Sequence, residues 1–371
     1  MSTEDVRRTR RDGHRRSAQE PASGAHARGD PATKRSARTL DDVAALSGVS
    51  RATVSRVING GPASETMQRH VQAVLDGTDY RPNAAARTLV TGRSGVVGVV
   101  IHLDPHLLFS DPYFSQLLQG IADQLAGQGA GMMLWLGNRT KQETLDHILW
   151  MGLLDGVIVT ANTREDPLVD GLLASPLPTV LIGHRSADRS ASYVDIDHVA
   201  AADMVTSHLV SIGRRRIGHI TGRRGTVAGE DRIEGYRRAM HRAGLSTDGL
   251  IVEGDFNRPS GTVGAVRLLD RGIDALFCAN DAMAGGALDA IRERGLRVPD
   301  DVALAGFDDL EFGAHLDPPL TTVRQGVRQQ GGEAALALFD LMREPGAGPR
   351  RVILPTELVI RPSTVGRPQR G

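Results

Sequence analysis

The sequence predicts an α/β protein that combines a small helical unit with two doubly wound lobes. Two observations support this fold class. Short apolar runs alternate with amphipathic helical segments over most of the chain, as in parallel sheets that are covered by helices on both faces. Ahead of them, three short segments with helix-capping residues surround a tight glycine turn, which is the arrangement of a helix-turn-helix.

Length and composition are those of a multi-domain globular protein. The chain has 371 residues, of which 40% are apolar, and its 44 basic and 44 acidic residues leave no net charge. The single cysteine, Cys278, excludes an internal disulfide framework and a cysteine-based zinc site. The sequence has neither an apolar run long enough to span a membrane nor the apolar stretch of a secretory signal. We therefore expect a cytoplasmic protein with no membrane partner.

Positive charge is concentrated in residues 1–38. This segment holds ten arginines and lysines against five acidic residues, and it is rich in Ser, Ala, Gly and Pro. It buries too little apolar surface to offset the chain entropy lost on folding, so we expect a disordered basic tail. Such a tail either adds nonspecific affinity for DNA or is a solvated extension with no role.

A helix-turn-helix unit is expected over residues 39–81. Thr39 and Asp42 have the spacing of an N-terminal cap, Gly48 ends this first helix, and Ser50 and Ser64 cap the next two. Each helix has one apolar face at helical spacing, formed by Leu40, Val43, Ala44 and Leu46, then by Val54, Val57 and Ile58, and then by Met67, Val71, Val74 and Leu75. From spacing alone, the alternative is a small helical bundle without DNA contacts.

Two sequence blocks resemble the lactose/galactose-repressor family of bacterial transcription regulators. They are TLDDVAALSGVSRATVSRVINGG at residues 39–61 and YRPNAAARTL at residues 80–89. The resemblance runs from Thr39 to about Thr364. It implies a helix-turn-helix DNA-binding domain at 39–81, a hinge helix and linker at 82–93, a two-lobed periplasmic-binding-protein-like effector and dimerisation domain at 94–364, and a flexible carboxyl terminus at 365–371.

The resemblance implies that the second helix and the hinge contact DNA. Arg51 and Arg56 match positions that reach base edges, where arginine pairs with guanine through two hydrogen bonds. Leu89 matches a leucine that wedges into a central CpG step and bends the duplex, although it could instead pack on the core. The implied DNA-binding residues are Ser50, Arg51, Ala52, Thr53, Ser55, Arg56, Asn59, Asn83, Ala86, Arg87 and Leu89.

The larger part of the chain alternates strand and helix. Ligands of such folds bind at the carboxyl ends of the strands, and a cleft between two lobes is a preferred pocket. We expect strands at 96–101, 132–136, 156–160, 179–182, 193–196, 217–221, 251–254, 275–278 and 302–306, and helices that include 113–125, 231–243 and 281–294.

Polar and aromatic residues follow several of these strands. Asn280, Asp308 and Phe256 each come directly after a strand, and Arg232 is expected at the start of a helix. Such side chains hydrogen-bond adjacent sugar hydroxyls and cover the apolar face of a sugar ring. A simple ion pair and a core phenylalanine are the alternative. The effector site implied by the resemblance comprises Tyr113, Phe114, Asp197, Arg232, Phe256, Asn280, Asp308 and Gln325.

Motifs of enzymes and metal sites are missing. The sequence has no G-x-S-x-G, no P-loop and no H-E-x-x-H, and its twelve histidines are scattered. We expect His184, His198 and His219 to be ordinary surface or core residues. No catalytic residue, metal or cofactor is therefore predicted.

We interpret the chain as a homodimeric, nucleoid-associated repressor of carbohydrate-utilisation genes. Each helix-turn-helix would read half of a near-palindromic operator, and a mono- or disaccharide would release the protein. A sugar-binding receptor and a sugar-processing enzyme on the same two-lobed fold are the alternatives. The sequence leaves open the identity of the effector, the operator and the sign of regulation.

Overall fold

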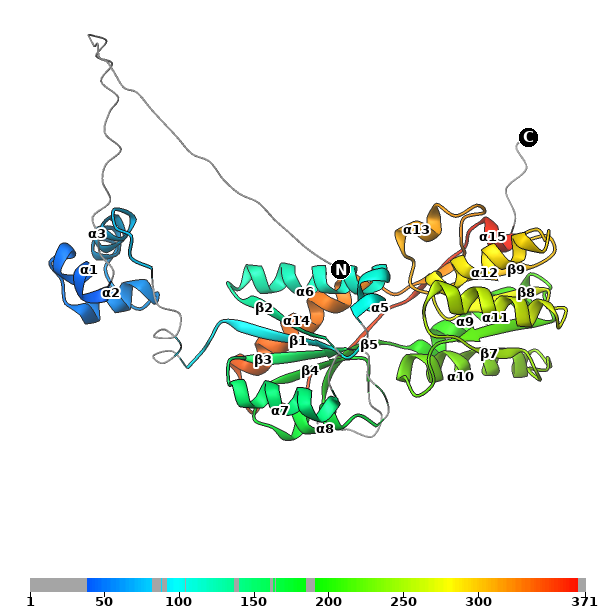
Figure 1. Ribbon diagram of the computed structural model, residues 1–371, viewed down its shortest axis with the longest axis horizontal. Coiled ribbons are helices and arrows are strands. Elements are labelled where there is room, and N and C mark those ends of the chain that lie inside the picture. Colours follow the sequence, from blue (N-terminus) through cyan, green and yellow to red (C-terminus); the bar gives the residue numbers. More distant parts are fainter. Residues whose placement is uncertain are drawn as a thin grey trace, which may run out of the picture. The chain divides into compact units, whose positions relative to one another are not determined.

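Figure 1 shows the computed structural model of the chain, which falls into two compact units, Met1–Asn83 and Ala84–Gly371. It describes residues 39–365 apart from 82–87, 89–91, 104, 137–139, 161–162, 164 and 185–190. The expected basic tail, most of the expected carboxyl terminus and the four hinge residues predicted to contact DNA (Asn83, Ala86, Arg87 and Leu89) lie outside the described residues.

Three capped helices form the first unit, and the caps are the predicted ones. Thr39 Oγ1 accepts a hydrogen bond from the Asp42 amide (3.2 Å), and the Asp42 carboxylate accepts one from the Thr39 amide (2.9 Å). Ser50 and Ser64 each accept from the amide three residues later, and Gly48 adopts φ 66° at the tight turn. The helices are α1 (Leu40–Ser47), α2 (Arg51–Ile58) and α3 (Glu65–Asp76).

One valine from each helix forms the centre of this unit. Val43, Val54 and Val71 are fully buried, and the remaining predicted apolar positions pack around them, with one exception. Leu46 is 37% exposed. At about 100° per residue it lies well off the buried stripe of α1, which is centred on Ser47, whose hydroxyl donates to the Val43 carbonyl.

The second unit has two lobes, and the first is built on a six-stranded parallel sheet with the order β11-β5-β4-β3-β1-β2. Helices α6 and α14 cover one face, and α7 and α8 pack together on the other (Figure 1). The strands are β1 (Val96–Ile101), β2 (Gly131–Leu136), β3 (Gly156–Thr160), β4 (Thr179–Ile182), β5 (Ser192–Ile196) and β11 (Arg351–Leu354). The helices are α5 (Pro105–Ser110), α6 (Pro112–Gly127), α7 (Lys141–Met151), α8 (Pro167–Ala174) and α14 (Val327–Arg343).

The second lobe is built on a four-stranded parallel sheet with the order β7-β6-β8-β9. Helices α9 and α10 pack as one pair, and α11 and α12 as another (Figure 1). The elements are β6 (Ile217–Thr221), β7 (Ile251–Glu253), β8 (Ala275–Cys278), β9 (Ala303–Ala305), α9 (His198–Ser211), α10 (Val227–Arg242), α11 (Arg258–Leu269) and α12 (Asp281–Glu293). The unit also contains two short helices, α13 (Glu311–Ala314) and α15 (Pro362–Val365), and an antiparallel pair, β10 (Thr322–Arg324) with β12 (Glu357–Val359).

The nine expected strands match observed strands to within one residue at each end. Helix α10 differs more, because it begins at Val227 rather than at Asp231. Thr226 caps it by accepting a hydrogen bond from the Gly229 amide (3.3 Å), so Arg232 lies in the second turn rather than at the start. Strands β10, β11 and β12 were not predicted; each has only three or four residues, and β10 and β12 have no apolar run.

Candidate functional site

Helix α2 presents a polar surface that fits the predicted contact with DNA. Arg51, Ala52 and Arg56 are exposed, whereas Val54 is buried in the core of the helical unit. The guanidinium of Arg51 lies 3.4 Å from Asp41, and both side chains are about two-thirds exposed, so DNA phosphates or bases could replace this partner at little cost.

The other predicted residues of this surface hold its geometry. Ser50 caps the helix through the Thr53 amide, and Asn59 donates to Ser55 Oγ (3.3 Å) at the opposite end. Both contacts are local to α2, so they stabilise the two ends of this helix.

A cavity of about 780 Å³ lies in the second unit, and both lobes line it. Six of the eight predicted effector-site residues belong to its wall, namely Tyr113, Phe114, Arg232, Phe256, Asn280 and Asp308. Asp197 and Gln325 do not line it. Asp197 is exposed and caps α9 by accepting from the Ala200 amide (2.8 Å), while Gln325 lies behind the wall and donates to Asp308.

Arg232 is the central cation of the wall. It is 4% exposed, its guanidinium stacks 3.7 Å from the centroid of the Phe307 ring, and its Nη1 lies 4.0 Å from Asp308 Oδ1. It also donates to the Ala279 carbonyl. Burial raises the pKa of Asp308 well above its ordinary value, and the charge of Arg232 opposes that rise.

Phe256 (φ 57°) and Asp308 (φ 118°) have backbone conformations that few residues other than glycine adopt. Such strain is concentrated at binding sites, where the surrounding structure holds it. The ring of Phe256 lies so close to Gly222 that a β-carbon there would be 1.9 Å from it, so only glycine admits this ring position. Asn280 fixes the same segment, since its Nδ2 donates to the Phe256 carbonyl (2.8 Å) while its Oδ1 caps α12.

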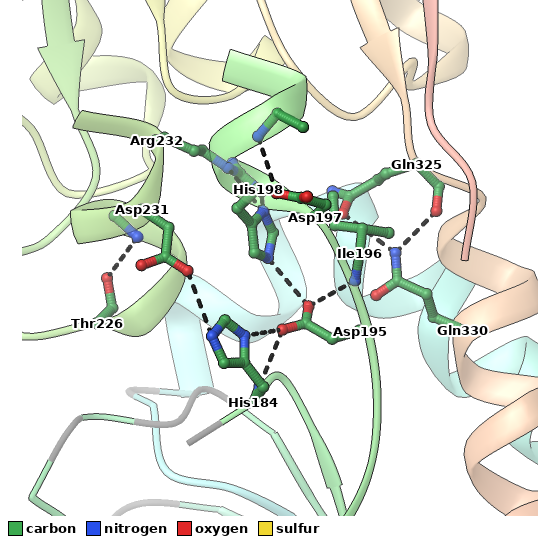
Figure 2. Close-up of polar contacts among 12 residues, drawn as sticks. His184, Asp195, Ile196, Asp197, His198, Thr226, Asp231, Arg232, Gln325 and Gln330 are labelled. Carbon is green, nitrogen blue, oxygen red and sulfur yellow. Dashed lines mark hydrogen bonds and ion pairs between the residues drawn. The ribbon is translucent and has the colours of Figure 1, made fainter. Parts of the chain in front are cut away.

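A buried carboxylate that the sequence analysis missed anchors the opposite side of Arg232. Asp195 in β5 accepts from His184 Nδ1 (2.7 Å) and from His198 Nε2 (3.1 Å), as Figure 2 shows. Burial by itself raises the pKa of Asp195, but the hydrogen bonds from both histidines outweigh it, so the pKa lies below the ordinary value. The signal in the sequence was a carboxylate inside an apolar strand, two residues before Asp197.

His198 connects this carboxylate to Arg232. The guanidinium nitrogens Nε and Nη2 both lie 3.4 Å from His198 Nδ1. A guanidinium only donates, so Nδ1 accepts and the proton of the neutral ring is on Nε2, facing Asp195. Burial lowers the pKa of His198, which favours this neutral form.

The three histidines thus differ in their surroundings. His198 lines the cavity, which was not expected of it, whereas His184 bonds to Asp195 and does not line the cavity. His219 is a core residue, as expected, and stacks on Phe277 with 4.5 Å between ring centroids. Among the described residues, no group of three or more His, Cys, Asp or Glu side chains is arranged to hold a metal ion.

The chain matches known families in both units. Residues 39–83 match the bacterial regulatory proteins of the lacI family, and residues 206–364 match a periplasmic-binding-protein-like domain. Over 332 residues the chain is 38% identical to the HTH-type transcriptional regulator CelR of Thermobifida fusca, which covers 88% of this chain and 98% of that protein. The chain belongs to the lacI family.

Other relatives of this lacI-family regulator point to the same family. The ribose operon repressor of Escherichia coli K12 is 31% identical over 88% of this chain and 99% of its own length. A solved CelR–cellobiose complex has a TM-score of 0.70 at 35% identity, covering 88% of this chain and all of that one. The lac repressor dimer bound to operator and the anti-inducer ONPF has a TM-score of 0.78 at 28% identity, covering 88% and 98%.

These matches confirm the predicted fold class and family. These relatives are transcription regulators rather than enzymes. No helix in the described part of the chain has the length and apolar character needed to cross a membrane.

Proposed function

We propose that this lacI-family regulator is a homodimeric repressor of carbohydrate-utilisation genes, released from a near-palindromic operator by a small uncharged sugar. The observation that carries this proposal is the cavity wall, which brings together Arg232, Asp308, Asn280 and the aromatic residue Phe256. Charged and amide groups beside an aromatic face suit the hydroxyls and apolar face of a sugar ring. The protein would act in the cytoplasm on nucleoid DNA, without catalytic residue, metal or cofactor.

The charges around the cavity favour an uncharged ligand. Every lysine and arginine among the described residues of the wall faces a carboxylate, so an anionic ligand would have to displace one. The pairs are Lys141 with Asp166 (2.7 Å), Arg223 with Asp255 (2.6 Å), Arg258 with Asp289 (2.8 Å) and Arg232 with Asp308 (4.0 Å).

We assign DNA recognition to the domain at 39–81 and to the hinge at 82–93, and effector binding and dimerisation to 94–364. A sugar bound between the lobes favours the lobe arrangement that it contacts best. The hinge joins this unit to the DNA-binding unit, so a change in the lobes lowers affinity for the operator. The lac repressor dimer on its operator and CelR with cellobiose are the relatives that support this division.

The test uses the full-length protein and a binding site selected from random duplexes. Fluorescence anisotropy then measures affinity for this duplex with cellobiose, maltose, ribose or glucose added. We expect sequence-specific binding that one sugar weakens at least fivefold. Absence of sequence preference would refute operator recognition, and specific binding that no sugar alters would refute the sugar effector.

A further inference from the structure

A second polar cluster lines the cavity on the first lobe. His102 follows β1, Lys141 is the first residue of α7, and Thr163 follows β3. The carboxylate of Asp166, which caps α8, lies behind them. None of these residues belongs to the predicted effector site, and all come from the lobe opposite to that of Arg232.

Lys141 has a hydrogen-bond donor to spare. Its ammonium group donates to Asp166 Oδ2 (2.7 Å) and to Thr163 Oγ1 (3.2 Å). An ammonium group carries three N–H donors, and the third has no partner among the described residues. The two existing bonds fix the nitrogen in place, so the remaining N–H needs little further ordering when it meets a ligand.

His102 offers a second unused group beside it. Its Nδ1 is shielded from solvent and has no hydrogen-bond partner in the described part of the chain. Burial, followed by the nearby charge of Lys141, lowers the pKa of this imidazole, so the ring is neutral near pH 7. A buried polar atom without a partner costs free energy, which a ligand hydroxyl would recover.

The cavity has room for more than one sugar ring. Its volume of about 780 Å³ lies in the upper half of the range of about 300–1,000 Å³ that is usual for ligand pockets. Arg232 and Asp308 come from the second lobe, and Asp195 beside them comes from β5. His102, Lys141 and Thr163 come from the segment after β1, from α7 and from the segment after β3. Two polar centres in one cavity, one around Arg232 of the second lobe and one around Lys141 of the first, suit two linked rings.

We infer that His102 and Lys141 form a second sugar subsite, which binds an uncharged pyranose ring joined to the ring held by Arg232 and Phe256. The effector is then a disaccharide or a longer sugar. This inference rests on the proposed function. The pairing of Lys141 with Asp166 makes the subsite electrically neutral, so it selects a hydroxyl rather than a phosphate.

The test is isothermal titration calorimetry on the full-length protein with cellobiose, maltose, glucose and glucose 6-phosphate. Glucose affinity is also measured by displacement of the bound disaccharide. We expect Lys141→Met to lower disaccharide affinity at least tenfold while glucose affinity changes less than twofold, and His102→Phe to act in the same direction. Lys141→Arg keeps a donor and should restore part of the loss. Arg328→Met, which removes a cation from an exposed pair with Asp123, is the matched control.

Each contrary outcome has a separate meaning. An equal loss for glucose and disaccharide, or no loss at all, would overturn the subsite. Wild-type protein that binds a monosaccharide but no disaccharide would overturn it as well and leave the proposed function standing. If glucose 6-phosphate binds more tightly than glucose and Lys141→Met removes the difference, the subsite binds an anion and the proposal of a neutral ring is wrong. Failure of every sugar would instead refute the sugar effector itself.

Discussion

Arg232 illustrates how a buried cation is held ready for a ligand. Phe307 stacks on one side of its guanidinium, and Asp308 lies beside Nη1. His198 accepts a hydrogen bond from its Nε and donates one to Asp195. Each contact removes rotamer freedom that a ligand would otherwise have to restrict. The side chain is therefore positioned before the sugar arrives.

Replacing Arg232 by alanine should abolish the response to sugar while leaving operator binding intact. Hydrogen bonds to charged groups are worth about 1.5–3 kcal/mol, and the change also leaves Asp308 buried without its cation. We expect sugar affinity to fall at least tenfold, with operator affinity within twofold of wild type, both measured by anisotropy and calorimetry. Arg238→Ala, on the exposed side of the same helix, is the control. Unchanged sugar release in Arg232→Ala would place the effector elsewhere.

His219 gives a prediction about stability and pH. Burial lowers its pKa to about 4, whereas an unfolded chain has the ordinary value of 6.5. Above pH 6.5 neither state is protonated and the full stability is present. Between pH 6.5 and about 4 the histidine is protonated in the unfolded chain but not in the folded one, so the free energy of unfolding decreases as the pH falls.

His219→Phe should flatten this dependence, because phenylalanine keeps the stack with Phe277 and Tyr236 and has no charge to gain. The difference between wild type and variant should approach about 1.4 kcal/mol per pH unit in this window. Urea unfolding between pH 4.5 and 7.5 measures it, with the exposed His241→Phe as control. Parallel curves for wild type and His219→Phe would contradict the assignment.

At the scale of elements, α2 combines one buried stripe with one exposed polar face. Its cap, Ser50, and its core residue, Val54, fix the helix, and Arg51 and Arg56 lie on its exposed side. The two arginines contribute nothing to the core, so replacing them tests recognition without a change in folding.

Arg51→Ala and Arg56→Ala should each lower affinity for the specific duplex by about 1–3 kcal/mol, the usual value of a bidentate contact with guanine. Affinity for random DNA should fall much less. Arg69→Ala, on the exposed face of α3, should change the specific and nonspecific affinities alike. An unchanged ratio of specific to nonspecific affinity in the double variant would show that α2 does not read the sequence.

At the scale of the whole molecule, effector and operator share one free energy of coupling. If the sugar weakens operator binding by some factor, the operator must weaken sugar binding by the same factor. Calorimetry of the sugar with and without saturating operator, compared with anisotropy of the operator with and without sugar, tests this equality. Unequal factors would mean that a third species, such as a change in oligomeric state, takes part.

The basic tail should affect DNA binding without affecting its specificity. Deleting residues 1–37 removes nine of the ten positive charges of the segment and leaves the Thr39 cap intact. We expect nonspecific affinity and its salt dependence to fall while the ratio of specific to nonspecific affinity holds. Loss of discrimination by the truncated protein, with its helical signal unchanged by circular dichroism, would assign the tail a role in recognition.

Short-range interactions explain why so much of the fold could be predicted. The caps at Thr39, Ser50 and Ser64 bond to amides three residues away, and the central strands are continuous apolar runs, so neighbouring residues suffice to specify them. The edge strand β11 escaped prediction because its residues alternate between buried and exposed and its pairing with β5 lies more than 150 residues away.

The candidate site divides in the same way. Phe256, Asn280 and Asp308 closely follow strands, and Arg232 lies in the helix after β6, where the pattern of the chain points to a ligand. Contacts between distant segments decided the rest. The Asp197 carboxylate accepts a hydrogen bond that caps its own helix. Asp195 accepts hydrogen bonds from His184 and His198, and His198 in turn accepts from Arg232, 37 residues after Asp195. A hydrogen bond between residues three apart, such as the Asp197 cap, depends only on local sequence, whereas a bond between distant segments forms only when the tertiary structure brings both partners together.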